Sequence, residues 1–271
     1  MGDKKKKGFN IKRIIAAVII VPLLISYIYY LPPQPFFLFL LIIVGMITMH
    51  EFYTMYNVPS LLAVPGVLIG GALFYFFCSY PQYSLDGIFV GLLFVMVLRL
   101  LMISTPSGSM ADLGPLGLGF IYISGFLSFQ WFIRIADSGM KYIFLLYVSV
   151  WLADSMAYYI GKYLGRNKLY PSVSPNKTIE GALGSVIGGI AGALLIRSLL
   201  DIPDMTTTGA VMTGAVIGIA TLIGDLIESM FKRDAGVKDS SSLIPGHGGL
   251  LDKLDGMLVA GPILYFIVRY S

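Results

Sequence analysis

Charged residues are scarce in this sequence, and cysteine and histidine are scarcer still. Only 13% of the 271 residues are charged and 56% are hydrophobic, whereas a soluble domain carries about 25% charged residues. A soluble single domain cannot bury that much apolar surface, so this class of protein is excluded. The single cysteine, Cys78, excludes an internal disulfide and a cysteine-based metal site. The two histidines, His50 and His247, offer little for a histidine-based metal site.

Long apolar runs instead recur from one end of the chain to the other, and the mean hydropathy is +0.81. A membrane helix needs about 20 mostly apolar residues, so we predict an all-α, polytopic transmembrane helical bundle of about nine spans. The expected spans are residues 12–30, 36–56, 61–78, 86–103, 113–134, 143–164, 181–199, 209–228 and 255–270. The first run follows a basic start but has no small-residue cleavage site, so we interpret it as a retained helix.

The positions of the nineteen lysine and arginine residues predict the orientation in the membrane. With nine spans and the N-terminus inside, most of these residues fall near the inner face, as the excess of basic residues in cytoplasmic loops requires. We therefore expect a cytoplasmic N-terminus. The two most polar loops, 165–180 and 229–254, then share the cytoplasmic side. The short chain suggests the inner (cytoplasmic) membrane of a bacterium.

A weakly charged loop at 104–113 divides the chain, and almost all candidate functional residues follow it. We expect residues 1–110 to form an N-terminal transmembrane helical region and 111–271 a C-terminal transmembrane catalytic region. Small residues spaced three or four apart in 181–199 and 209–228 indicate close helix packing and make a homodimer reasonable. We find no internal repeat of the kind that inverted-repeat transporters have.

Acidic side chains at membrane depth are costly and therefore mark candidate sites. Asp154 lies in the middle of a span, and Asp225 and Glu228 project from one helical face because they are three residues apart. Asp252 and Asp255 repeat that spacing where the last span begins. Each acid alone could be a helix cap or an ion-pair partner. Two pairs at one opening favour a Mg²⁺ site that substrate phosphates complete.

Basic and small residues accompany these acids in both polar loops. Lys232, Arg233, Lys238 and Asp239 precede a glycine-rich segment at 245–249 that contains His247. Lysine, arginine and close backbone amides can bind phosphate, although such a loop is often only a topology signal or a contact with anionic lipid.

The other polar loop carries Ser174, Asn176, Lys177 and Thr178. Ser174 or Thr178 could cap the following helix, whose free amides would suit a phosphate. Capping does not explain Asn176 and Lys177.

Residues 229–255 resemble the signature motif of CDP-diacylglycerol synthases, also called phosphatidate cytidylyltransferases. The motif reads Ser229-x-Phe231-Lys232-Arg233, four residues, Lys238-Asp239-x-Ser241, two residues, Ile244-Pro245-x-His247-Gly248-Gly249-Leu250-x-Asp252-Lys253-Leu254-Asp255. Residues 174–181 resemble a second motif of that family. One position departs from the pattern: the family has arginine where this chain has Lys253, which keeps the charge but loses the two-pronged hydrogen bonding.

The resemblance implies that CTP and phosphatidate react to give CDP-diacylglycerol and pyrophosphate. The lipid phosphate is itself the nucleophile, so no serine, cysteine or histidine nucleophile is needed. A divalent metal and basic side chains supply positioning and electrostatic stabilisation. The implied cofactor is Mg²⁺, with the question of a second cation open. The implied partners are CTP, phosphatidate and the lipid bilayer, with no nucleic acid.

The resemblance also assigns roles to the candidate residues. The principal metal ligands are expected to be Asp225 and Asp252, and the secondary ones Asp255, Glu228 and Asp154. The catalytic group is Asp225, Asp252, Lys232, Arg233 and His247. The substrate-binding residues are Ser174, Asn176, Lys177, Lys238, Asp239 and Lys253.

Two alternatives stay open. Another nucleotide-dependent lipid phosphotransferase, such as a lipid kinase, would also need a metal, a nucleotide and a lipid entrance. A cation-coupled transporter would also place Asp154, Asp225 and Glu228 in the membrane, but it has no need for the basic loop. CDP-alcohol phosphatidyltransferases are disfavoured because their Asp-Gly-x-x-Ala-Arg pattern is absent.

Overall fold

The computed structural model describes residues 11–202, 205–243 and 248–270. The helices are α1 (Ile11–Tyr30), α2 (Leu38–Met55), α3 (Ser60–Ser79), α4 (Ser84–Met102), α5 (Ser109–Leu118), α6 (Phe126–Ile135), α7 (Gly139–Leu164), α8 (Ile179–Leu200), α9 (Thr207–Asp234) and α10 (Leu251–Tyr270). Three short helical turns are η1 (Pro33–Phe37), η2 (Pro81–Tyr83) and η3 (Gly119–Gly125). The strands β1 (Lys168–Tyr170) and β2 (Ser174–Thr178) pair antiparallel.

The described part of the chain is helical apart from this one hairpin, and its helices confirm a multi-pass membrane protein. Seven stretches are long and apolar enough to cross a bilayer. They are Pro33–Met55, Ser60–Ser79, Pro81–Met102, Ser109–Ile135, Gly139–Leu164, Ile179–Leu200 and Thr207–Asp234. Helices α1 and α10 occupy the two other expected ranges but are not among the seven. Helix α10 has 20 residues and includes Asp252, Lys253, Asp255 and Arg269.

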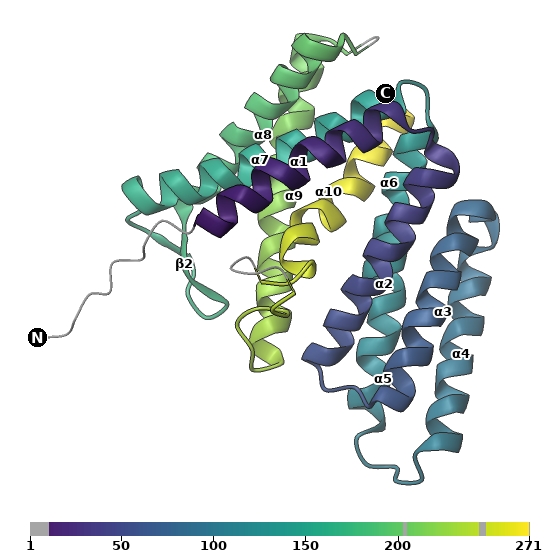
Figure 1. Cartoon of the computed structure of the whole chain (residues 1–271). Helices are drawn as coiled ribbons and strands as arrows, with labels where there is room; N and C mark the ends of the chain where they lie inside the picture. Colours follow the sequence, from purple (N-terminus) through teal and green to yellow (C-terminus); the bar gives the residue numbers. More distant parts are fainter. Residues whose placement is uncertain (1–10, 203–204, 244–247, 271) are drawn as a thin grey trace, which may run out of the picture.

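The helices form two groups that meet at α10 (Figure 1). Helices α2 to α6 lie on one side, α7 to α9 lie on the other, and α10 packs against α6, α7 and α9. The two groups also meet at the ring of Phe231 on α9, which lies 5.5 Å from the ring of Phe52 on α2 and 5.6 Å from that of Tyr122 in η3. The first half of the chain therefore supports the end of α9 that carries the basic residues.

Close backbone approaches hold α8 and α9 together, as the small residues in their sequences predict. A Cβ atom at Gly189 would collide with the backbone of Gly214 and Gly218, and one at Gly218 would collide with the backbone of Ser185. The Ser185 hydroxyl donates a hydrogen bond of 2.9 Å to the Gly218 carbonyl. These contacts fix the position of α9 against α8.

The hairpin lies directly before α8 and is anchored to it. Thr178 caps the helix, since its hydroxyl accepts a hydrogen bond of 3.1 Å from the Gly181 amide. Ser174, the other candidate cap, lies in β2 instead. The Glu180 carboxylate accepts a hydrogen bond of 3.0 Å from the Arg166 amide at the base of the hairpin.

One buried arginine, Arg99, holds the loop at 103–108 in place. The Arg99 guanidinium lies 2.6 Å from the Asp112 carboxylate and donates to the backbone carbonyls of Ile103, Thr105 and Ser107. These bonds tie α4 to the start of α5. The division of the chain into regions 1–110 and 111–271 stays a prediction.

Candidate active site

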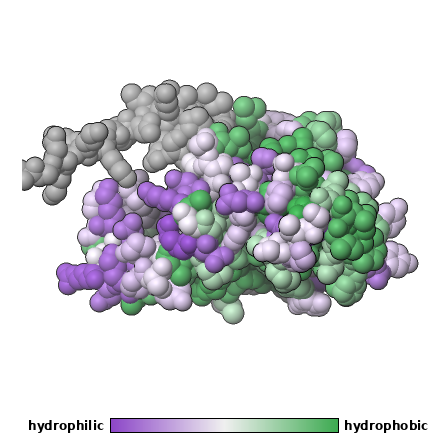
Figure 2. Space-filling model, turned by 90° about the horizontal axis from the view of Figure 1, so that it is seen from below, coloured by the Kyte–Doolittle hydropathy of each residue, from purple (hydrophilic) through white to green (hydrophobic). Residues whose placement is uncertain are grey.

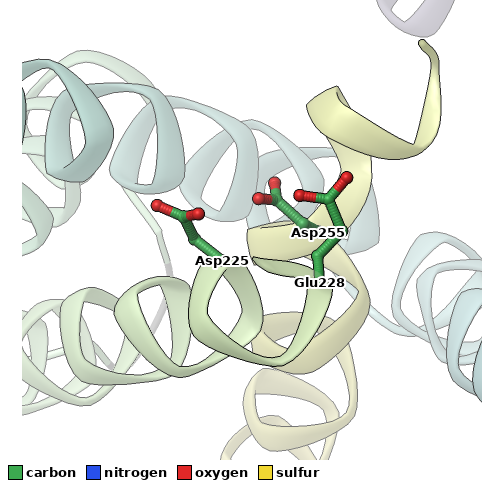
Figure 3. Close-up of side chains that lie close together, drawn as sticks. All are labelled: Asp225, Glu228 and Asp255. Carbon is green, nitrogen blue, oxygen red and sulfur yellow. The ribbon is translucent and has the colours of Figure 1, made fainter. Parts of the chain in front are cut away.

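Three carboxylates from two helices meet inside the membrane-spanning bundle. Asp225 and Glu228 lie one turn apart on α9, beside Asp255 on α10 (Figure 3). Each offers an oxygen, and these oxygens lie within 4.8 Å of one another. Gly224 makes this possible because a Cβ atom there would collide with the Asp255 carbonyl, so only glycine lets the two helices come this close. We call Asp225, Glu228 and Asp255 the carboxylate cluster.

Two lysines lie directly beside the cluster. Lys177 Nζ, from the hairpin, is 2.8 Å from Asp225 Oδ2. Lys232 Nζ is 2.5 Å from Glu228 Oε2 and 2.6 Å from Asp252 Oδ1. Lys232 thus bridges an acid of the cluster to an acid outside it.

The cluster is suited to a divalent cation. Glu228 and Asp255 are buried, and Glu228 Oε1 has no hydrogen-bond partner among the described residues. Buried carboxylate oxygens that lack a donor carry a large desolvation cost, which a bound cation offsets. Hard oxygen ligands of this kind match Mg²⁺.

Asp252 shares Lys232 with Glu228 of the cluster and also takes part in a hydrogen-bond network with the loop before α10. Its Oδ1 accepts from Lys232, and its Oδ2 accepts from the Ser240 hydroxyl at 2.8 Å and from the Gly249 amide at 2.7 Å. Both oxygens are therefore engaged with the protein. The assignment of Asp252 as a principal metal ligand stays a prediction, and in this structure the residue holds Lys232 in place.

A cavity of about 740 Å³ opens beside the cluster and is lined by both polar loops. The predicted site residues that line it are Asp154, Asn176, Lys177, Asp225, Glu228, Lys232, Asp239, Asp252, Lys253 and Asp255. Viewed from below, the molecule shows hydrophilic residues gathered over one part of this end and hydrophobic residues over the rest (Figure 2). The structure thus joins the two polar loops at one site.

Other predicted site residues do not line this cavity. Arg233 is exposed and donates hydrogen bonds of 3.3 Å to the Val173 carbonyl and 2.9 Å to the Val237 carbonyl, so it connects α9 to the hairpin. Lys238 is exposed, and Ser174 is half-buried in β2. His247 lies outside the described residues.

The Gly249 amide and the two amides that follow it are already occupied. We expected them to approach a phosphate, but the Gly249 amide donates to Asp252, while the Leu250 and Leu251 amides donate to Glu51 at 2.9 Å each. The Gly249 amide thus binds one of the protein's own carboxylates, and phosphate binding by the rest of this segment stays a prediction.

Three further residues were missed in the sequence. Tyr158 and Lys162 line the cavity from α7, and they follow Asp154 at intervals of four, which places all three on one helical face. That spacing could have identified Tyr158 and Lys162 as neighbours of Asp154 from the sequence. Glu51 on α2 is the third, and its only signal was an acid near the inner end of an apolar run.

Fold and site together define a multi-pass membrane protein with a cluster of carboxylates suited to a cation, beside lysines, at one end of the bundle. The chain belongs to the cytidylyltransferase family, whose model matches residues 11–271. It is 34% identical to the phosphatidate cytidylyltransferase of Bacillus subtilis over 242 residues, which is 86% of this chain and 88% of that protein.

Two further relatives carry the same name. The Staphylococcus epidermidis protein is 32% identical over 232 residues, which is 83% of this chain and 87% of that protein. The Synechocystis protein is 47% identical over 131 residues, which is 48% of this chain and 44% of that protein.

Proposed function

We propose that this protein is a phosphatidate cytidylyltransferase, which converts CTP and phosphatidate to CDP-diacylglycerol and pyrophosphate in phospholipid biosynthesis. The observation that carries the proposal is the cavity where the carboxylate cluster meets Lys177, Lys232 and Lys253 within a chain of this family. Relatives with this name match over most of their length. The acids suit a metal, and the lysines suit the phosphates of a nucleotide and a lipid.

Asp225, Glu228 and Asp255 would hold Mg²⁺, and whether a second cation binds is open. When bound, the cation supplies positive charge to the triphosphate and its departing pyrophosphate. The support is the donor set itself, three close carboxylates of which one oxygen has no partner in the described structure. Asp154 lines the same cavity, and we assign it as a further ligand or as a partner of one.

The lysines position two polyanions against each other. An oxygen of the phosphatidate phosphate forms a bond to the α-phosphorus of CTP, and the bond from that phosphorus to the bridging oxygen breaks. The electron pair leaves with pyrophosphate. The nucleophile is already anionic, so no proton must be removed by the protein. The phosphates are held in line by Lys177, Lys232 and Lys253. Holding the two reactants in this geometry lowers the activation barrier.

The remaining sequence-based assignments belong to this proposal. Asn176, Asp239, Lys238 and Ser174 are proposed substrate contacts, and Arg233 and His247 are proposed members of the catalytic group. For Arg233, the hydrogen bonds to Val173 and Val237 support a role in holding the hairpin beside α9.

We further propose nine spans, a cytoplasmic N-terminus and a site that faces the cytoplasm. Helices α1 and α10 would complete the seven apolar stretches. The excess of lysine and arginine near one set of helix ends supports this orientation. The bacterial relatives support a place in the inner membrane. A homodimer stays a prediction, because the small residues of α8 and α9 pack within the chain.

The position of a radioactive label tests the reaction. Purified protein in phosphatidate-containing detergent micelles with Mg²⁺ should transfer label from [α-³²P]CTP to the lipid fraction and release pyrophosphate. Label from [γ-³²P]CTP or [γ-³²P]ATP should stay out of the lipid. Transfer of γ-label would instead identify a lipid kinase. If no α-label enters the lipid and Lys253→Arg does not restore transfer, the proposal is lost.

A further inference from the structure

Glu51 lies on α2, in the first part of the chain, yet its carboxylate is bound to the loop that precedes α10. Oε1 accepts hydrogen bonds from the Ser241 hydroxyl at 2.6 Å and the Leu250 amide at 2.9 Å. Oε2 accepts from the Leu251 amide at 2.9 Å and the Ser240 hydroxyl at 3.4 Å. These donor residues follow Glu51 in the sequence by 189 to 200 positions.

The side chain is buried, with 3% of its surface exposed. Burying a carboxylate is unfavourable unless its oxygens are supplied with donors, and here four donors converge on it. Two of them are backbone amides at the start of α10, where the free N–H groups of a helix favour a negative charge. Glu51 therefore acts as a cap that comes from a distant helix.

The two glycines before α10 fit this arrangement. A Cβ atom at Gly249 would collide with the Ser240 hydroxyl and lie 2.6 Å from Glu51 Oε2. A Cβ atom at Gly248, whose φ is +85°, would lie 2.6 Å from Asp252 Oδ2. The pair Gly248-Gly249 thus leaves space for the carboxylates of Glu51 and Asp252.

A short chain of contacts leads from Glu51 to the carboxylate cluster. The Ser240 hydroxyl shares its one hydrogen between Asp252 at 2.8 Å and Glu51 at 3.4 Å. Asp252 accepts from Lys232, and Lys232 pairs with Glu228. Leu251, bound to Glu51 through its amide, is the first residue of α10 and precedes Asp255 by four positions. Both routes connect α2 to residues of the site.

We propose that Glu51 is a positioning residue for the reaction, fixing the first turn of α10 so that Lys232 and Asp255 reach their places in the site. The inference rests on the proposed function for its catalytic readout. It also gives the N-terminal helices a role, because α2 then locks the loop that carries the signature residues. Glu51 does not touch substrate or metal in this account.

The test compares Glu51→Gln with His50→Gln, an exposed neighbour on the same helix. In Glu51→Gln a neutral amide group replaces the carboxylate, so the hydrogen bonds to Leu250 and Leu251 weaken. We expect kcat for cytidylyl transfer to fall about 10–100-fold, the scale found for outer partners of metal ligands. The Mg²⁺ concentration at half-maximal rate should rise, because Asp255 belongs to the carboxylate cluster and Lys232 is paired with Glu228. A merely structural residue would lower the yield of folded protein and leave the Mg²⁺ dependence as it was.

Hydrogen–deuterium exchange supplies a readout that needs no activity. The peptide covering 248–254 should exchange faster in Glu51→Gln than in His50→Gln. If the unmodified protein transfers no label from CTP, the proposed function fails, and this exchange measurement alone decides the role of Glu51. Should Glu51→Gln fail to fold, Ser241→Ala removes one donor and must shift kcat and the Mg²⁺ dependence in the same direction. The proposal is overturned if Glu51→Gln has the same transfer rate, Mg²⁺ dependence and hydrogen–deuterium exchange as His50→Gln.

Discussion

Replacing Lys232 with methionine should destabilise the protein strongly. Lys232 Nζ lies 2.5 Å from Glu228 and 2.6 Å from Asp252, and the Glu228 side chain is only 1% exposed. Methionine is an unbranched apolar side chain only one atom shorter than lysine, but it leaves Glu228 buried without its cation. Removing one partner of a buried ion pair costs about 3–5 kcal/mol. At about 2–4 °C per kcal/mol, the melting temperature should fall by about 6–20 °C.

The assay is thermal unfolding of purified protein in one detergent. Mg²⁺ is left out, so that no metal ion replaces Lys232 in balancing the negative charge of Glu228 and Asp252. Lys253→Met is the matched control because Lys253 lines the same cavity but is exposed, and it should melt within about 2 °C of the unmodified protein. The double variant Lys232→Met/Glu228→Gln should regain part of the loss, since the uncompensated carboxylate is gone. The reasoning fails if Lys232→Met melts at the same temperature as Lys253→Met.

Two further variants probe the loop before α10. Gly249→Ala should lower both the melting temperature and the transfer rate because its Cβ would collide with Ser240 and Glu51, whereas Gly114→Ala on α5, where a Cβ would meet nothing within 4 Å, should leave both unchanged. Equal behaviour of the two alanine variants would contradict the tight fit at Gly249. Asp252→Asn should lower kcat with a smaller rise in the Mg²⁺ requirement than Asp225→Asn causes. A larger rise would support the prediction that Asp252 is a principal metal ligand.

The helical, membrane-spanning architecture was predictable because apolar length and composition alone decide which segments cross a bilayer. The hairpin was not. Its strands have three and five residues, Pro175 lies inside the second, and no alternation of apolar and polar residues marks them. They are held by contacts with the start of α8, such as the Glu180 carboxylate on the Arg166 amide. Such contacts leave no periodic signal in the sequence.

The carboxylate cluster was predictable in part. The three-residue spacing correctly placed Asp225 and Glu228 on one face of α9, and the small residues correctly indicated close helix packing. Which acid of α10 would meet them depended on that packing, since Gly224 contacts the backbone at Asp255. Asp252, one turn earlier, is instead taken by Ser240, Gly249 and Lys232. Spacing within one helix cannot distinguish these outcomes.

Glu51 could not be assigned from the sequence because its partners lie at the other end of the chain. An isolated acid at the end of an apolar run is equally compatible with a helix end in contact with water. Only the folded structure shows its carboxylate among four donors from the loop before α10.

The rate of CMP transfer from CTP to phosphatidate, measured against Mg²⁺ concentration for the unmodified protein and for Asp255→Asn, tests the central claim most directly. If the carboxylate cluster holds the cation used in the reaction, the unmodified protein shows a saturable Mg²⁺ dependence. Asp255→Asn should then be inactive, or should need a much higher Mg²⁺ concentration, while keeping a folded elution profile. A folded Asp255→Asn protein with the rate and Mg²⁺ dependence of the unmodified one would contradict the account.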